Sequence, residues 1–90
     1  MSASSELRRT LVLPAGVDLH ARPAGALVRT AASYEAGVAV SAGDRRADAK
    51  SILQVLSLGA TGGSAIELSA SGPDASAALD AIAELLDSFG

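Results

Sequence analysis

The chain has 90 residues, enough for one small domain, and a formal net charge of −3 at pH 7. It has no cysteine and one histidine, which excludes disulfides, thiolate catalysis, Cys-based metal sites and a multi-histidine metal site within one chain. The mildly acidic balance, with one Tyr and one Phe, argues against a nucleic-acid binder, which needs a basic face to offset phosphate charge.

The N-terminal segment has no apolar run after a basic start, so it does not read as a signal peptide. No stretch approaches the roughly 18 uninterrupted apolar residues of a membrane span. We therefore expect a cytoplasmic protein that does not insert into membranes and that needs no metal or other cofactor. Residues 1–6 are expected to form a flexible leader and residues 7–90 a single domain.

Turn residues divide the rest of the chain into short segments whose hydrophobic pattern predicts strands and helices. The clearest strand periodicity is in residues 65–71, with Ile66, Leu68 and Ala70 on one side. Asp74 is expected to cap the last helix, whose buried stripe is predicted to be Ala75, Ala78, Leu79, Ile82 and Leu86. In chain order we predict strand 7–13, helix 21–34, strands 37–42 and 45–49, helix 51–58, strand 65–71 and a helix after residue 74.

One-sided alternation in the strands and one-sided stripes in the helices indicate a single sheet with one covered face and one wet face. The expected fold class is therefore α+β, a two-layer open-faced sandwich in the order βαββαβα. Arg45 and Arg46, near the hairpin, are interpreted as solvated charges. Asp80, Glu84 and Asp87 are interpreted as the polar face of the last helix and are assigned no chemistry.

The segment around His20 carries the chemical information. Proline is tolerated only in the first turn of a helix because it has no N–H to donate, so Pro23 places the helix start at or just before Ala21. His20 is then at or next to the N-cap, and the unsatisfied N–H groups of the first turn point toward its imidazole. Together with the helix dipole and the Arg22 guanidinium, these groups make a small anion site.

A lone histidine at a helix start has two interpretations. In the commoner one, it is a surface polar residue or a poor cap. In the other, its neutral imidazole is a nucleophile near pH 7, with an unperturbed pKa of about 6.5, and a phosphoryl group on it is met by the N–H groups and Arg22. Spacing alone does not decide between the two.

Two separated motifs add information. The first is Leu19-His20-Ala21-Arg22-Pro23-Ala24, and the second, in residues 50–59, reads Lys-Ser-Ile-Leu-Gln-Val-Leu-Ser-Leu-Gly. Both resemble motifs of the HPr family, the histidine phosphocarriers of the phosphoenolpyruvate-dependent phosphotransferase system, and the spacing between them matches without a gap. The resemblance covers about residues 11–86 and implies a four-stranded antiparallel sheet with three helices on one face.

The resemblance also implies the chemistry. His20 is expected to accept a phosphoryl group from enzyme I on Nδ1 and to donate it to enzyme IIA components in carbohydrate uptake. Arg22 matches the active-site arginine, and the N–H groups of Ala21 and Arg22 are the expected phosphate binders. Such a protein is a carrier in a relay and not a turnover enzyme in itself. Two alternatives stay open: a nitrogen-branch regulatory phosphoprotein, and a small-molecule-binding or assembly module in which His20 is incidental.

One departure from the family pattern lies directly before the active-site motif. The family usually has glycine before the Leu-His pair, often preceded by a small polar residue, and here these places hold Asp18 and Val17. Three effects of Asp18 are open: it orients the imidazole, it raises the imidazole pKa, or it repels a phosphoryl group.

The second motif predicts both a cap and a docking surface. Ser51 and Gln54 form a capping-box pattern worth about 1 kcal/mol, and the resemblance adds regulatory phosphorylation of Ser51 by an HPr kinase/phosphorylase. The short helix is too apolar to bury all its side chains, so part of it is expected to dock partners of a monomeric protein. The alternative is ordinary scattered exposure. The expected partner-binding residues are Arg29, Lys50, Ile52, Leu53 and Leu56.

Overall fold

The computed structural model describes residues 6–90, so the expected leader lies outside the described residues except for Glu6. Each predicted element is present, with boundaries that differ by at most two residues. The first helix ends two residues early because the N–H groups of Ser33 and Tyr34 bond carbonyls three residues back. The elements are β1 Leu7–Val12, α1 Ala21–Ala32, β2 Gly37–Ala42, β3 Arg45–Asp48, α2 Ile52–Ser57, β4 Ala65–Ser71 and α3 Ala75–Ser88.

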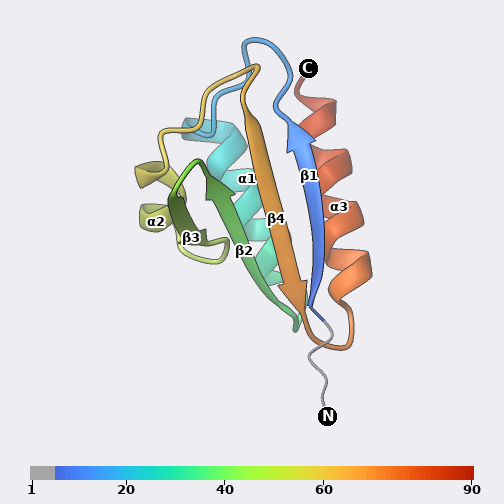
Figure 1. The fold of residues 1–90 in the computed structure, drawn as a ribbon. Helices are drawn as coiled ribbons and strands as arrows, with labels where there is room; N and C mark the ends of the chain where they lie inside the picture. The colour runs from blue at the N-terminus through green and yellow to red at the C-terminus, as the bar shows by residue number, and fades with distance from the viewer. Residues whose placement is uncertain (1–5) are drawn as a thin grey trace.

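The four strands form one antiparallel sheet in the order β1-β4-β2-β3 (Figure 1). The first strand therefore pairs with the last, and β1 and β3 are the edges. Helices α1 and α3 pack side by side against one face, and α2 contacts α1 and the β3 edge. This arrangement confirms the predicted α+β open-faced sandwich. Among residues 6–90, no helix combines the length and apolar character needed to cross a bilayer.

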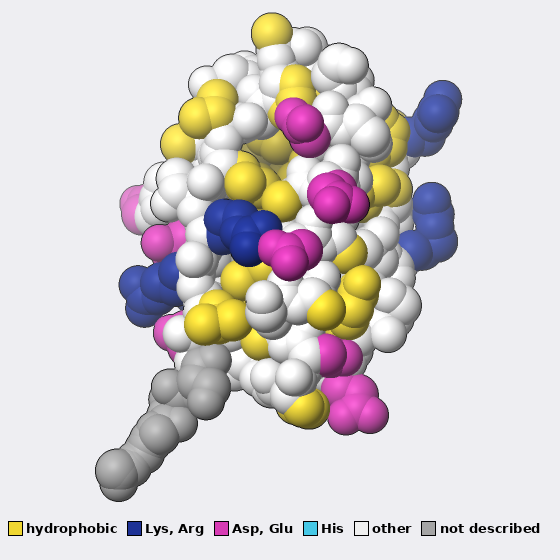
Figure 2. All heavy atoms as spheres, turned by 90° about the vertical axis from the view of Figure 1, so that its right-hand side faces the viewer, with side chains coloured by type: hydrophobic (Ala, Val, Ile, Leu, Met, Phe, Trp, Pro, Cys, Tyr) yellow, Lys and Arg dark blue, Asp and Glu magenta, His cyan; other side chains and the backbone are white. Residues whose placement is uncertain are grey.

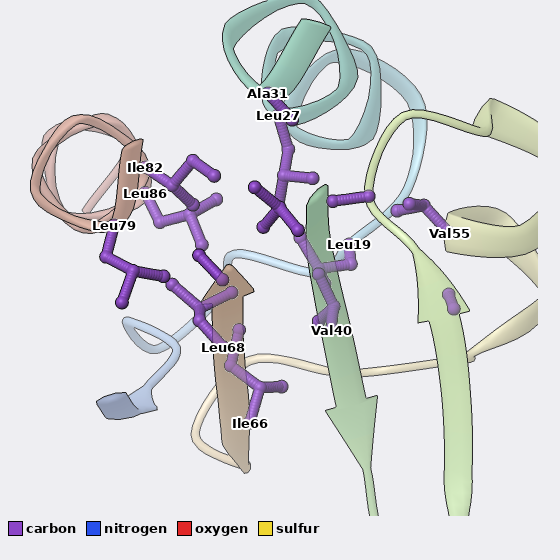
Figure 3. Close-up of a cluster of buried hydrophobic side chains, with 14 of the residues drawn as sticks. Leu19, Leu27, Ala31, Val40, Val55, Ile66, Leu68, Leu79, Ile82 and Leu86 are labelled. Atoms are coloured by element: carbon purple, nitrogen blue, oxygen red, sulfur yellow. The ribbon is translucent and has the colours of Figure 1, made fainter. Parts of the chain in front are cut away.

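The hydrophobic core lies between the sheet and the helices, and every buried residue in it is Leu, Ile, Val or Ala. Figure 3 shows side chains of α1, β2, β4 and α3 meeting there. The stripe predicted for the last helix is buried in full. Leu19 is also in this core, with 1% of its surface exposed, although it belongs to the loop before α1. Its burial anchors the chain immediately before His20.

Asp74 has a different role from the predicted cap. It is the N-cap residue of α3 by position, but its carboxylate makes no capping bond. Instead, Oδ2 accepts the N–H of Glu35 at 2.9 Å and Oδ1 accepts the N–H of Ala36 at 2.8 Å, both in the turn between α1 and β2. The Glu35 and Ala36 N–H groups, with the charge of Lys50, outweigh desolvation and hold the pKa of Asp74 below its ordinary value.

This hydrogen bonding predicts a specific acid sensitivity. Because the pKa of Asp74 is lower in the folded chain than in the unfolded chain, its contribution is present above the unfolded pKa of about 3.9 and is lost as pH falls through the folded value. We expect the Tm of the wild type to fall more steeply than that of Asp74→Asn between about pH 5 and about pH 2. Thermal unfolding followed by circular dichroism measures this, with Asp87→Asn as the control. Equal slopes for wild type and Asp74→Asn contradict the prediction.

Two of the charged residues that were assigned no chemistry form bonds in the structure. Arg45 donates to the carbonyl of Ser57 at 2.9 Å, at the C-terminal end of α2. A cation there also interacts favourably with the negative end of the helix dipole. Arg9 of β1 forms an ion pair with Asp80 of α3 at 2.6 Å. Figure 2 shows the face formed by β1 and α3, where acidic side chains are interspersed with apolar ones. Both residues are exposed, as expected, and each also makes a hydrogen bond or ion pair that the sequence did not predict.

Candidate active site

His20 occupies the N-cap of α1, as Pro23 predicts. Its backbone is extended, with φ −141° and ψ 164°, and its carbonyl accepts the N–H of Ala24 at 3.4 Å. The side chain is exposed and makes no capping hydrogen bond. The imidazole is therefore not used as a cap, which leaves its ring nitrogens available for chemistry.

The first turn of α1 offers hydrogen-bond donors next to this imidazole. Ala21 and Arg22 precede the point at which intrahelical bonds begin, and within residues 6–90 their N–H groups have no backbone partner. Pro23 has no N–H. Such donors at the positive end of a helix dipole generally favour anions, and the exposed Arg22 side chain lies in the same turn.

Ala21 has an unusual backbone conformation, with φ of +44°. It is the one non-glycine residue with positive φ among the described residues, and this left-handed region costs an L-residue about 1–2 kcal/mol. The chain thus turns sharply into the helix directly after His20. No local pattern in the sequence predicted this turn, because alanine at that place favours the ordinary helical region.

The backbone strain at Ala21 can be tested by substitution. Glycine adopts positive φ without steric cost, so Ala21→Gly is expected to raise the free energy of unfolding by up to about 1 kcal/mol, after allowing for the greater entropy of glycine. Ala77→Gly, at an exposed place in the first turn of α3, should instead lower it by about 1 kcal/mol. Urea unfolding measures both. Equal losses in the two variants would show that Ala21 is not strained.

The loop before His20 is hydrogen-bonded to a second loop, a contact that was not predicted. Oδ1 of Asp18 accepts the N–H of Gly62 at 2.8 Å, and the N–H of Leu19 donates to the carbonyl of Ala60 at 2.9 Å. Gly62 has no room for a side chain, because a Cβ there would lie 2.6 Å from the Gly16 nitrogen. Nothing in the sequence of residues 61–63 connects them with His20.

The second motif forms the helix that was predicted, with one difference. Oγ of Ser51 accepts the N–H of Gln54 at 3.3 Å, which confirms the N-cap. The reciprocal half of a capping box is absent, because Oε1 of Gln54 accepts the N–H of Asp48. Ile52 and Leu53 are exposed, to 40% and 77%.

The other residues predicted to bind partners differ in their surroundings. Leu56 is half-buried against the core. Arg29 is exposed, and its guanidinium lies along α1 near Gly25. Lys50 is half-buried, and its Nζ donates to the Tyr34 carbonyl at 2.8 Å, just beyond the C-terminal end of α1. This bond gives Lys50 a structural role, and its contact with partners stays a prediction.

Residues 6–90 thus form an open-faced α+β sandwich in which an exposed histidine and two amides without a backbone partner lie at the start of α1. Residues 7–88 match the family described as "PTS HPr component phosphorylation site". The chain belongs to this family, the HPr phosphocarriers of the phosphotransferase system.

Individual relatives agree with this assignment. The chain is 44% identical over 80 residues to a multiphosphoryl transfer protein of Xanthomonas campestris pv. campestris, covering 89% of this chain but 9% of that much longer protein. It is 37% identical to the phosphocarrier protein NPr of Shewanella violacea, covering 92% and 91% of the two chains. The crystal structure of HPr-C-His from Thermoanaerobacter tengcongensis has a TM-score of 0.87 and 34% identity, over 91% and 92% of the chains.

Proposed function

We propose that the protein accepts a phosphoryl group from enzyme I on Nδ1 of His20 and transfers it to enzyme IIA components in carbohydrate uptake. The observation that carries the proposal is the exposed His20 imidazole beside two amide donors at the start of α1 that have no backbone partner within residues 6–90. The Nδ1 lone pair attacks phosphorus, the N–P bond forms, and the bond to the donor breaks. An acceptor nucleophile then attacks the same phosphorus and releases neutral imidazole.

The first turn explains how the carrier holds the group without trapping it. The N–H groups of Ala21 and Arg22 and the Arg22 guanidinium offset the charge of the phosphoryl oxygens. Because His20 is exposed, both the donor and the acceptor protein can reach the phosphorus atom. The protein is consumed in one transfer and regenerated in the next, so it acts as a carrier.

Incubation of the protein with enzyme I, Mg²⁺ and phosphoenolpyruvate tests this proposal. Intact-mass measurement should show one added phosphoryl group, which should disappear when a purified enzyme IIA and its sugar-specific permease components are supplied. An unmodified mass after incubation with an enzyme I that phosphorylates a control HPr would exclude the carrier function.

The nitrogen-branch alternative is supported by the similarity to an NPr phosphocarrier, which extends over 92% of this chain. In that case the phosphorylation state regulates partner binding and does not feed transport. Transfer from the phosphorylated protein to sugar-specific and nitrogen-specific enzyme IIA proteins, measured side by side, separates the two functions. Faster transfer to the nitrogen-specific protein favours the regulatory function.

We propose that partners dock on α2, which contacts α1 and carries the exposed apolar side chains Ile52 and Leu53. Leu56 is expected to complete this apolar surface, and Arg29 and Lys50 to attract acidic partner surfaces. Leu53→Ser should lower kcat/KM for phosphorylation by enzyme I by about tenfold, since a buried interface leucine contributes about 1–2 kcal/mol.

A matched control separates docking from folding. Leu7 is also apolar and 42% exposed, but it begins β1 at the end of the sheet away from the first turn of α1 (Figure 1). Leu7→Ser should leave kcat/KM with enzyme I unchanged. Equal losses in Leu7→Ser and Leu53→Ser would show that α2 is not the docking surface.

Ser51 is proposed as a regulatory phosphorylation site for an HPr kinase/phosphorylase. Its Oγ already caps α2, so a phosphate there would lie at the positive end of that helix and add negative charge beside Ile52. Treatment with such a kinase and ATP, followed by intact-mass measurement of wild type and Ser51→Ala, tests the assignment. A phosphorylated Ser51→Ala variant would contradict it.

A further inference from the structure

Asp18 is hydrogen-bonded both to His20 and to the loop of residues 59–64. Its backbone carbonyl accepts the N–H of His20 at 2.8 Å, and its carboxylate accepts the N–H of Gly62 at 2.8 Å. The two loops run side by side at one end of the molecule (Figure 1). Asp18 therefore connects residues 59–64 to the segment that ends at the N-cap of α1, beside the backbone bond from Leu19 to Ala60.

The contact depends on a close approach of two backbones. The N–H of Leu13 donates to the Ser64 carbonyl at 2.9 Å, and the N–H of Gly63 donates to the Leu13 carbonyl at 2.8 Å. These bonds and that of Leu19 to Ala60 join backbone to backbone at both ends of the contact. Among the described residues, the Asp18 carboxylate supplies the one side-chain bond between the two loops.

Burial along the loop shows which of its residues reach solvent. Val17 and Leu19 are buried, with 6% and 1% exposed, whereas Asp18 and His20 are exposed. Asp18 and His20 thus emerge on the solvent side, where a phosphoryl donor must approach. A carboxylate without a partner at this place would repel the phosphoryl oxygens. The Gly62 N–H is a donor that partly offsets its charge and restricts its position.

We propose that Asp18 is a positioning residue for His20. Its bond to the Gly62 N–H fixes the segment that ends at the N-cap and keeps the carboxylate hydrogen-bonded to that amide. This role rests on the proposed phosphocarrier function. It departs from the usual family pattern, which has glycine at this place, because glycine has no side chain to reach Gly62. Of the three effects left open by the sequence, the structure supports orientation, exerted through the backbone.

Three variants test the role. Asp18→Ala removes the acceptor, Asp18→Asn keeps an acceptor oxygen without the charge, and Asp44→Ala removes an exposed aspartate from the β2–β3 turn as a charge control. We expect Asp18→Ala to accelerate amide hydrogen exchange at Gly62 by about tenfold, and to lower kcat with enzyme I by about tenfold with little change in KM. Asp18→Asn and Asp44→Ala should stay within about twofold of wild type in both measurements.

The outcomes separate this role from the proposed function. Unchanged Gly62 exchange or unchanged kcat in Asp18→Ala would overturn the positioning role while leaving the carrier function intact. Equal losses in Asp18→Asn and Asp18→Ala would also overturn it, because the charge and not the hydrogen bond would then be responsible. A wild-type protein that takes no phosphoryl group from enzyme I would overturn the carrier function and the role of Asp18 with it.

Discussion

Replacement of His20 by alanine is expected to abolish phosphorylation by enzyme I and phosphoenolpyruvate. His20 is the one histidine in the chain, so no second imidazole can take over its role, and there is no cysteine to act as another strong nucleophile. The rate of adduct formation, followed by intact-mass measurement, should fall by at least about a thousandfold. Of the changes considered for this protein, this one has the largest expected effect on function.

The loss should be chemical and not structural. The His20 side chain is exposed and makes no capping bond, so its removal should change the free energy of unfolding by less than about 0.5 kcal/mol in urea. Arg46→Ala, which removes an exposed side chain from β3, is the control for an unrelated surface change. A phosphoryl adduct that survives His20→Ala would place the acceptor elsewhere and refute the assignment.

The elements of the fold were predictable because their signals are local. A strand alternates every second residue and a helix repeats about every 3.6, so Ile66 and Leu68 could be assigned to the core before any contact was known, and both are buried. The N-cap place of His20 was predictable for the same reason. Pro23 restricts the backbone within three residues of it, and this restriction alone locates the start of α1.

Contacts between side chains and distant backbone groups could not be predicted in this way. Local preference makes Asp74 a cap for α3, but the folded chain brings two N–H donors from the turn 38 and 39 residues away, and the carboxylate bonds both of them. Asp18 reaches Gly62 across 44 residues. Such partners exist only after the sheet has aligned its loops, so the residue pattern around Asp18 contains no information about them.

The reason for glycine at position 62 also could not be predicted from the local sequence. A Gly-Gly pair usually indicates a turn in which a residue has positive φ. Gly63 has this conformation, with φ of +86°. Gly62 does not adopt positive φ. It is glycine because the backbone of residues 14–17 passes too close for a side chain, which is a property of the tertiary structure and cannot be read from the sequence around it.

Gly62→Ala is accordingly expected to be the most destabilising single-methyl change in the active-site region. An added Cβ would lie 2.6 Å from the Gly16 nitrogen, 2.8 Å from the Val17 nitrogen and 2.9 Å from the Pro14 carbonyl oxygen. All three are backbone atoms, which cannot rotate away as a flexible side chain would. The two loops must therefore separate, and we expect the free energy of unfolding in urea to fall by about 3 kcal/mol.

Gly37→Ala is the matched control, because a Cβ at Gly37 meets nothing within 4 Å and its φ is not in the left-handed region. That variant should be unchanged or more stable by about 0.5 kcal/mol, since alanine restricts the unfolded chain. Separation of the loops should also weaken the Asp18 bond, so Gly62→Ala should react more slowly with enzyme I even at temperatures where it is folded. If Gly62→Ala were as stable and as fast as Gly37→Ala, residues 59–64 would have no part in holding His20 in place.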